Sequence, residues 1–450
     1  MISSSLSRQI LRRSSASFST AAGAGGRNVV VVGGVRLPFA QTSTIYNDEL
    51  AVDLQRLAIT GLLTQTALPK DAVDYVICGN VIQEVKTSNI AREAAINAGL
   101  PYHIGAHTVA QACISANAAI ATGAQQIMTG HADVVLAGGV ETFSDVPIRL
   151  SRNMRQKLIT MNKAMKKGGP LGAVQHMLKG FSFKDMALET PAIANYTTGE
   201  VMGVSSDKLS AKFGVSRQEQ DEFTVRSHTL AAKAHADGFY KEEIIAYKGS
   251  TTENGIKGDS TIESVSKLKP AFIKPHGTHT AANSSYLTDG AAMSLLMSEE
   301  KAKELGMQPW AYVRDWSFRA CNPWDELLLG PTYCTSDILQ RNNLTLDDMG
   351  VLEIHEAFAG QILSNLVAMD SDKFADDNLG GKKVGAIDLD KMNTKGGSLS
   401  IGHPFGATGS RLVTTASRRL QQEEQRFALL AACADGGLGH ACLLERYDPQ

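Results

Sequence analysis

Residues 109–128, VAQACISANAAIATGAQQIM, place one cysteine, Cys113, between a short β-like run and a helix-like run of small residues. A strand that leads directly into a helix is the repeating unit of an α/β fold. A thiol at the start of such a helix faces unpaired backbone N–H groups and the positive end of the helix dipole, which lower its pKa. Two interpretations of Cys113 are therefore open, a small core residue and a reactive thiol.

The same alternation of apolar strands and amphipathic helices runs through most of the chain from Asn28 onward, which predicts a parallel or mixed sheet flanked by helices. Longer polar and glycine-containing stretches interrupt it over residues 144–286 and indicate an insertion. We therefore expect an N-terminal half at 28–143 and 287–307, an inserted loop domain at 144–286, and a C-terminal half at 308–450. The similar series of elements in the two halves indicates a duplicated unit.

The composition is that of a globular protein, with 450 residues, 43% hydrophobic and 20% charged, and a formal net charge of −2. No run of Lys and Arg indicates a nucleic-acid surface, and no apolar run reaches the roughly 20 residues of a membrane-spanning helix. Six cysteines are scattered along the chain without a CxxC pair, which favours a reducing compartment over a disulfide framework. They are Cys78, Cys113, Cys321, Cys334, Cys433 and Cys442.

The N-terminal residues 1–27 have the composition of a mitochondrial transit peptide. They include Arg8, Arg12 and Arg13, many serines and no acidic residue. A disordered tail without a targeting role is the alternative. We exclude this segment from the fold.

A basic segment at about 148–184 lies inside the insertion, and no acidic residue occurs between Asp145 and Asp185. Apolar residues recur at helical spacing along one face of it, namely Met154, Leu158, Met161 and Met165. Such a basic amphipathic helix can lie on an anionic membrane surface, with its cations at the head groups and its apolar face at the acyl boundary. An ordinary surface helix that packs this face on the body is the alternative.

Three further stretches contain residues suited to chemistry. GGSLSIGHPFGATGSR places His403 among glycines just before Pro404, which favours a loop position ahead of a helix. EIHEAFAG places His355 and Glu356 at the end of an apolar strand, where a loop at the edge of the sheet presents them. AACADGGLGH places Cys433 at the start of a glycine turn, in which backbone N–H groups approach a ligand closely.

Other motifs are too sparse to indicate a cofactor. The HxxH at His276 and His279 lacks the further ligands of a zinc site, so we expect no metal. The first predicted strand is not followed by a GxGxxG fingerprint for a dinucleotide.

The stretches CISANAAIATG, NTKGGSLSIGHPFGATGSR and CADGGLGHA resemble the three signature regions of thiolases, in order and at comparable separations. The similarity covers essentially all of residues 28–447. It implies a thiolase fold, an α/β architecture in which duplicated βαβαβαββ halves pack as five layers (α/β/α/β/α), with an inserted loop domain.

The resemblance assigns roles to residues of this chain. It implies that Cys113 is the nucleophile, that His403 is the base, that Cys433 is the general acid, and that a group at His355 stabilises an enolate. The backbone N–H groups of Cys113 and Asp435 are the implied oxyanion donors. The implied contacts to coenzyme A and to the acyl chain are Ser285, Phe272 and Met202.

Two positions depart from the common pattern. Most thiolases have asparagine at the position of His355, and an imidazole there either donates directly or holds a water. Asp435 stands where glycine or alanine is usual, and a carboxylate near an oxyanion raises the barrier unless it points away. The alternative functions are a condensing enzyme of the ketoacyl synthase type, which Cys433 disfavours, and an impaired lipid-binding or scaffold member.

His355 and the basic insertion are most similar to a branch of thiolases that form the β subunit of a mitochondrial trifunctional complex. The resemblance implies cleavage of long-chain 3-ketoacyl-CoA by CoA, the last step of mitochondrial fatty-acid β-oxidation, with CoA as co-substrate and no further cofactor. It also implies a homodimer that assembles with an α subunit bearing hydratase and hydroxyacyl dehydrogenase activities. The implied location is the mitochondrial matrix, with peripheral contact between the basic segment and the inner membrane. No nucleic-acid partner is implied.

Overall fold

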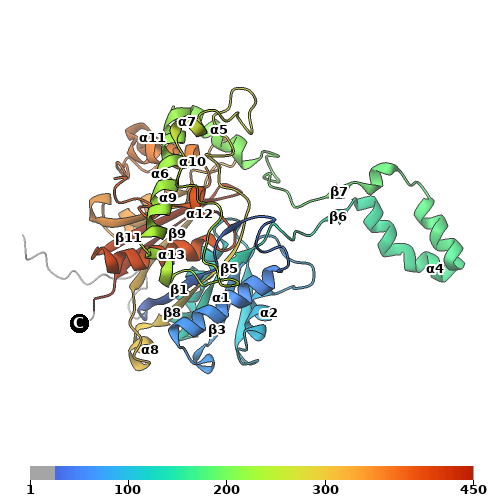
Figure 1. The fold of residues 1–450 in the computed structure, drawn as a ribbon, viewed down its shortest axis with the longest axis horizontal. Coiled ribbons are helices and arrows are strands. Elements are labelled where there is room, and N and C mark those ends of the chain that lie inside the picture. Colours follow the sequence, from blue (N-terminus) through green and yellow to red (C-terminus); the bar gives the residue numbers. More distant parts are fainter. Residues whose placement is uncertain (1–25, 449–450) are drawn as a thin grey trace, which may run out of the picture.

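The computed structural model describes residues 26–448 of the chain. A mixed sheet covered by helices on both faces forms the body, and a helical arm projects from it (Figure 1). The predicted transit peptide lies outside the described residues, apart from residues 26 and 27. Among the described residues, no helix is long and apolar enough to cross a bilayer.

The N-terminal half alternates strands and helices as predicted. Its elements are β1 (Val29–Arg36), β2 (Ala40–Gln41), α1 (Ala51–Thr66), β3 (Tyr75–Gly79), α2 (Ile90–Asn97), β4 (Gly105–Val109), α3 (Ser115–Met128), β5 (Val134–Glu141), β8 (Thr288–Ser298) and α8 (Glu299–Glu304). The residues of β1, β5 and β8 are buried along their whole length, because helices cover both faces of the sheet.

The C-terminal half repeats this series. Its elements are β9 (Ala311–Ala320), α9 (Gly330–Arg341), β10 (Met349–Ile354), α10 (Ala359–Asp370), α11 (Asp372–Asn378), α12 (Ser398–Ile401), α13 (Thr408–Gln422), β11 (Phe427–Ala434) and β12 (Leu438–Arg446). The last two strands form an antiparallel hairpin, closed by the predicted glycine turn after Ala434.

The strand pairings confirm that the two halves are copies of one unit. The main path of the sheet has the order β10-β11-β12-β9-β1-β8-β5-β3-β4, and a short β1–β9 pairing joins the halves. In the N-terminal half, β1 is antiparallel to β8, β8 is antiparallel to β5, and β5 is parallel to β3. In the C-terminal half, β9 is antiparallel to β12, β12 is antiparallel to β11, and β11 is parallel to β10. The counterpart of β4 in the second half is only a parallel bridge between Leu352 and Met392.

The helices and strands stack as the five layers that were predicted. Helices α1 and α2 cover the outer face of the N-terminal strands, and α9 and α10 cover the C-terminal strands. Helices α3 and α13 pack on each other between the two sets of strands. One hydrophobic cluster with residues from both halves surrounds this central pair, so the N-terminal ends of α3 and α13 are held in fixed relation.

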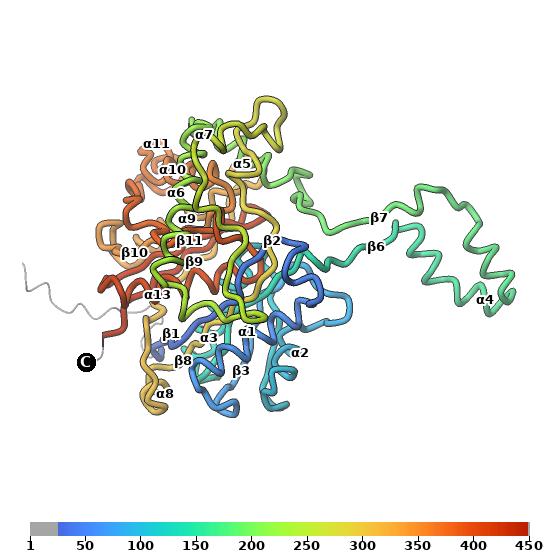
Figure 2. The backbone as a smooth tube through the Cα atoms, in the orientation of Figure 1, coloured from blue at the N-terminus to red at the C-terminus, as the bar shows by residue number. Residues whose placement is uncertain are grey.

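The insertion between β5 and β8 contributes two kinds of structure. Helices α5 (Met202–Phe213), α6 (Arg217–Ala236) and α7 (Ile262–Val265) pack on the body. Strands β6 (Arg149–Leu150) and β7 (Leu188–Glu189) form a stalk that leads to α4 (Arg152–Leu178). The whole arm extends away from the body (Figure 2). Short 3-10 turns lie at Lys70–Ala72, Phe183–Met186, Phe239–Glu242 and Leu346–Asp348.

Helix α4 is folded into a hairpin. Its backbone is non-helical at Gly168 and Gly169, just before Pro170, where the chain reverses. Lys157 in the first segment donates to the carbonyl of Met177 in the second at 3.1 Å.

The backbones of the two halves approach each other closely beside the central helices. Gly139 in β5 lies against the carbonyl oxygens of Gly79 in β3 and of Gly406, which precedes α13. The N–H of Gly406 also donates to the buried carboxylate of Glu141 at 3.1 Å. A side chain at Gly139 has no space, because its neighbours are backbone atoms that cannot rotate away.

We predict that Gly139→Ala lowers the free energy of unfolding by at least about 2 kcal/mol, since the new methyl group forces the halves apart. Gly168→Ala is the matched control, because a Cβ at Gly168 meets nothing within 4 Å and its φ is −132°. Urea unfolding followed by circular dichroism measures both. Equal stability of the two variants would contradict the close approach.

Candidate active site

Cys113 lies in a tight turn between β4 and α3. Ala112, just before it, has a φ of +46°, a left-handed conformation that residues with a side chain rarely adopt. The hydroxyl of Ser115 stabilises the turn, since it accepts from the N–H of Gln111 at 2.8 Å and donates to the carbonyl of Ala112 at 2.7 Å. The turn fixes the direction of the Cys113 side chain at the start of the central helix.

The expected fall in the pKa of Cys113 is wrong. The pKa of the thiol is raised to about 12, chiefly by burial and also by the charges of Asp435 and Glu141, although the N–H groups of Asp435 and of Cys113 itself hydrogen-bond to the sulfur and act in the other direction. Desolvation of a thiolate outweighs the helix terminus here. The resting group is a neutral thiol.

His403 lies between α12 and α13, at the N-terminal end of the other central helix. Its ring is buried, Nδ1 lies 2.6 Å from the hydroxyl of Thr408, and its backbone N–H donates to the hydroxyl of Thr288 at 2.9 Å. Burial lowers the pKa of His403 well below its ordinary value, as do neighbouring His355 and Arg411. His403 is therefore neutral.

His355 follows the last residue of β10 and lies beside His403, with 4.1 Å between the ring centroids. Burial and the positive charge of Arg411 lower its pKa to about 3. Its Nδ1 lies 2.9 Å from the hydroxyl of Ser398. Within residues 26–448, Nε2 of His355 and Nε2 of His403 are both buried without a hydrogen-bond partner. Two free ring nitrogens thus lie in one buried place.

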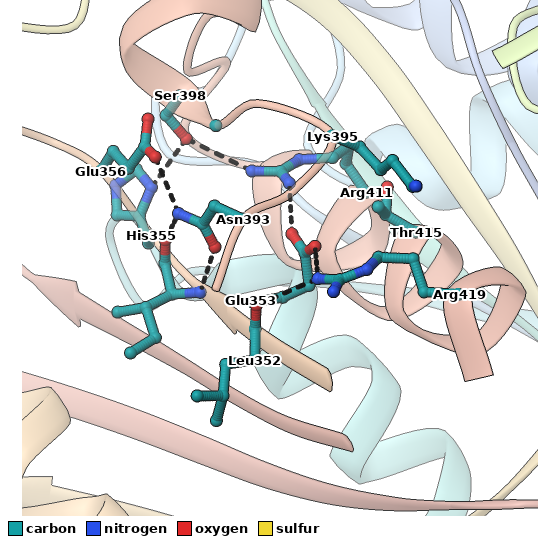
Figure 3. A network of polar contacts seen from close by, with 12 residues as sticks. Leu352, Glu353, His355, Glu356, Asn393, Lys395, Ser398, Arg411, Thr415 and Arg419 are labelled. Atoms are coloured by element: carbon teal, nitrogen blue, oxygen red, sulfur yellow. Dashed lines mark hydrogen bonds and ion pairs between the residues drawn. The ribbon is translucent and has the colours of Figure 1, made fainter. Parts of the chain in front are cut away.

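A buried network of charged and polar side chains lies next to His355 (Figure 3). Glu353, two residues before it in β10, bonds to Arg411 at 3.1 Å and to Arg419 at 2.8 Å, both from α13. Asn393 donates to the carboxylate of Glu356 at 2.8 Å. Because the carboxylate of Glu353 pairs with both arginines, these buried ion pairs fix β10 on α13.

Cys433 lies one residue before the end of β11 and is buried. Burial raises the pKa of this thiol well above its ordinary range, and a thiolate at nearby Cys113 would raise it further. Cys433 packs in an apolar cluster together with Met202 from the start of α5. Cys433 is thus near Cys113 and shares an apolar cluster with Met202, and the N–H of His355 donates to the carbonyl of Ala431, two residues before Cys433, at 2.8 Å.

The carboxylate of Asp435 is tied into the turn and to the insertion. Its Oδ1 accepts from the N–H of Gly436 at 2.7 Å and from Nδ2 of Asn195 at 2.8 Å. The oxygen of Asn195 accepts in turn from the N–H groups of Thr197 and Thr198. The side chain is thus held by donors, while the backbone N–H of Asp435 is left for the Cys113 sulfur.

A cavity of about 210 Å³ lies beside this region. Its lining includes Ser284, Tyr286 and Leu399, and the Tyr286 hydroxyl donates to the carbonyl of Ile401 at 2.7 Å, so the cavity adjoins the loop that leads to His403. The predicted Ser285 lies between two lining residues. Its N–H donates to the carbonyl of Ala357 at 2.9 Å.

The predicted Phe272 is not among the residues that line this cavity. Its ring packs edge-on against Phe358, and the absence of a side chain at Gly203 makes room for it.

Sequence reasoning missed Ser398, Thr408 and Asn195. Ser398 and Thr408 stand five residues before and five residues after His403, inside a motif that was already recognised, and their hydroxyls were the available signal. Asn195 gives no such signal, because it meets Asp435 across 240 residues. In the part of the chain that the structure describes, no group of three His, Cys, Asp or Glu side chains is placed to hold a metal ion.

Comparisons with protein families match both halves. The model "Thiolase, N-terminal domain" matches residues 29–300, and "Thiolase, C-terminal domain" matches residues 307–446. The mitochondrial trifunctional enzyme subunit beta of Homo sapiens is 53% identical over 427 residues, which are 94% of this chain and 89% of that protein. A probable 3-ketoacyl-CoA thiolase of Caenorhabditis elegans is 49% identical over 450 residues, 97% of this chain and all of that protein.

Solved structures share the fold. The human mitochondrial 3-ketoacyl-CoA thiolase in complex with CoA superimposes with a TM-score of 0.79 at 27% identity, covering 94% of this chain and 98% of that chain. The Bacillus anthracis acetyl-CoA acetyltransferase also has a TM-score of 0.79, at 30% identity, covering 94% of this chain and all of that chain.

We predict that alkylation of Cys113 by iodoacetamide accelerates with rising pH up to at least pH 10, because the pKa of about 12 keeps the thiolate scarce at neutral pH. Asp435→Asn removes the charge that raises this pKa and keeps an oxygen acceptor, so it speeds alkylation at pH 8 severalfold. Peptide mass spectrometry identifies the alkylated cysteine. The exposed Asp237→Asn is the control and leaves the rate unchanged. A wild-type rate that levels off near pH 7 would contradict this account.

Proposed function

The chain belongs to the thiolase family, and from this premise we propose that it cleaves long-chain 3-ketoacyl-CoA with CoA, to give acetyl-CoA and a chain-shortened acyl-CoA. This is the last step of mitochondrial fatty-acid β-oxidation. The observation that carries the proposal is the placement of four residues. Cys113 and His403 precede the two central helices, and His355 and Cys433 lie at the ends of the paired strands β10 and β11, with the two rings in contact and the two thiols close to each other. Relatives named as 3-ketoacyl-CoA thiolases support it.

The first step is attack by Cys113 on the 3-keto carbon. Since Cys113 and His403 are both neutral at rest, the thiol proton moves to Nε2 of His403 as the sulfur attacks, rather than before it. The oxyanion of the tetrahedral adduct accepts from the N–H groups of Cys113 and Asp435, which already point at the sulfur. Loss of one such donor typically costs roughly 3 kcal/mol of barrier.

The second step breaks the bond between the α and β carbons. The electron pair of that bond moves onto the thioester as an enolate of acetyl-CoA, and the acyl group remains on Cys113. The free ring nitrogens of His355 and protonated His403 face this charge. Cys433 then protonates the enolate carbon, a task that suits a thiol whose pKa burial holds well above its ordinary range, because it keeps its proton until needed.

The third step returns the enzyme to rest. His403 first passes the proton that it holds to the Cys433 thiolate, so both groups are neutral again. It then takes the proton of the incoming CoA thiol, the CoA sulfur attacks the acyl thioester, and Cys113 leaves and regains that proton from His403. The cavity beside Leu399 is our proposed entry for the pantetheine arm. Ser285, which stands between two lining residues, and Phe272 are the proposed contacts to CoA. Met202, which belongs to the same apolar cluster as Cys433, contacts the acyl chain in this proposal. CoA is a co-substrate, and the reaction needs no resident cofactor.

We also propose that the catalytic unit is a homodimer that joins an α subunit with hydratase and hydroxyacyl dehydrogenase activities, in the mitochondrial matrix. Names of relatives as a trifunctional enzyme subunit beta support the association. Strand β4 supports the dimer, since it is a half-buried edge strand that, among residues 26–448, pairs only with β3. We keep the domain division into 28–143 with 287–307, 144–286 and 308–450.

The arm supports a proposal of peripheral contact with the inner membrane. Of the 22 large hydrophobic side chains exposed among residues 26–448, thirteen lie between Ile148 and Tyr196. Ile159 and Phe183 are 77% and 89% exposed, and the same segment carries nine lysines and arginines between Asp145 and Asp185. Apolar groups beside cations on a projecting element suit an anionic lipid surface. One residue of the apolar face predicted for this segment does not contribute to the exposed surface, because Met154 is buried within the arm.

Cys433→Ala separates the two chemical roles of the thiols. We predict that it lowers the thiolysis rate of a long-chain 3-ketoacyl-CoA at least 100-fold, because the general acid for the carbon–carbon step is lost. Exchange of labelled CoA into a saturated acyl-CoA needs only Cys113 and His403, so it stays within about threefold of the wild-type rate. Cys113→Ala abolishes both reactions.

Three outcomes would contradict these assignments. Equal loss of thiolysis and exchange in Cys433→Ala would show that Cys433 does not act only at the carbon–carbon step. Persistent exchange in Cys113→Ala would exclude Cys113 as the nucleophile. A wild-type chain inactive in both assays would favour the scaffold alternative.

For the arm, we predict that the full chain sediments with vesicles containing anionic phospholipid and stays in solution with pure phosphatidylcholine vesicles. Replacement of Lys163, Lys166 and Lys167 by Gln weakens binding roughly 100-fold, since each cation near the surface contributes about 1 kcal/mol.

The matched control replaces three lysines of the body with Gln, namely Lys301, Lys303 and Lys373, which changes the net charge equally. Binding that falls as much in this control as in the arm variant would reject a specific role of the arm. Thiolysis of a short soluble substrate stays unchanged in both.

A further inference from the structure

Ser398 lies between His355 and a buried arginine, and the reaction as described gives it no task. Its hydroxyl oxygen is 2.9 Å from Nδ1 of His355 and 3.5 Å from Nη2 of Arg411 (Figure 3). Ser398 and His355 are completely buried, and Arg411 is nearly so. Because no water competes for hydrogen bonds at such a buried position, the hydrogen bonds of Ser398 are stable.

The donors and acceptors around this hydroxyl fix the direction of its proton. An arginine only donates, so Arg411 uses one lone pair of the Ser398 oxygen. Among residues 26–448, the remaining acceptor recorded for the hydroxyl proton is Nδ1 of His355. If His355 instead donated from Nδ1, the oxygen would accept twice and its own proton would have no partner, a costly state in a dry core.

From this geometry we propose that Ser398, oriented by Arg411, is a positioning residue that holds His355 in the tautomer with its proton on Nε2. His355 then donates an N–H directly to the enolate oxygen, and no bridging water is needed. The proposal rests on the proposed thiolase function. It gives a role to His355, which stands where most thiolases have asparagine.

Arg411 is itself fixed by the strand that carries His355. Its Nη1 bonds to Glu353 at 3.1 Å, and Glu353 also bonds to Arg419 at 2.8 Å. Strand β10, helix α13 and Ser398 therefore form one closed set of contacts around the imidazole. A rotation of Ser398 away from His355 breaks the contact with Arg411 as well.

The neighbouring histidine has the opposite arrangement. Nδ1 of His403 lies 2.6 Å from the Thr408 hydroxyl, and that hydroxyl has a second acceptor, the carbonyl of Pro404, at 3.3 Å. Thr408 can thus donate to Pro404 and accept from Nδ1–H of His403, which leaves Nε2 of His403 bare for the thiol proton. One ring supplies a donor and the other an acceptor, although their centroids are only 4.1 Å apart.

The direct test is the tautomer of His355 in the wild-type homodimer or complex, measured by long-range proton–nitrogen correlation on histidine labelled with nitrogen-15. We expect Nε2 to be protonated and Nδ1 to be bare, with the signals assigned by their loss in His355→Asn. A protonated Nδ1 in the wild type overturns the proposal. This readout does not depend on catalysis.

A kinetic test uses the isosteric pair Ser398→Thr and Ser398→Val, which differ only in the hydroxyl. We expect the valine variant to lower kcat for thiolysis about tenfold relative to the threonine variant, with KM unchanged, since only a transition-state donor is misplaced. Exchange between acyl-CoA and CoA forms no enolate and stays equal in the two variants.

The outcomes separate this proposal from the function on which it rests. Equal kcat in the two variants, or exchange that falls with thiolysis, overturns the role of Ser398. Absence of thiolysis in the wild type refutes the proposed function, while the spectroscopic test still decides the tautomer. If both variants fail to fold, Ser398→Ala replaces them in the kinetic comparison.

Discussion

The approach of backbone to backbone between the two halves is the constraint on which the site depends. Gly79, Gly139 and Gly406 bring β3, β5 and the loop before α13 together with no side chain between them. Glu141 then joins the same three segments, because it accepts from the N–H groups of Val81, Ile82 and Gly406. With the halves locked at this distance, the starts of α3 and α13 can carry groups that act on one substrate.

Burial sets the chemical state of the resting site. It raises the pKa of both thiols and lowers the pKa of both imidazoles, so four potentially charged groups are neutral in a dry pocket. Next to these groups, Glu353 forms buried ion pairs with Arg411 and Arg419. In a site of this kind, protons move only as bonds form and break. The direction of each proton transfer is set by the hydroxyl groups that fix which ring nitrogen of each histidine carries a proton.

Much of this could be predicted from the sequence. The alternation of strands and helices fixed the fold class, and three motifs pointed to Cys113, His403 and Cys433. The pKa of Cys113 was predicted in the wrong direction, because a helix N-terminus is visible in a sequence and the depth of burial is not. The contact between His355 and Ser398 spans 43 residues and that between Asn195 and Asp435 spans 240. Such contacts depend on how loops meet, which periodicity does not describe.

The division of labour between the two thiols is the central claim, and intact-protein mass spectrometry tests it most directly. The full chain is mixed with a long-chain 3-ketoacyl-CoA in the absence of CoA, and the labelled peptide is then identified. The account predicts a mass increase equal to the chain-shortened acyl group, carried on Cys113 alone. An acyl group on Cys433, or no acyl-enzyme while acetyl-CoA is released, would contradict it.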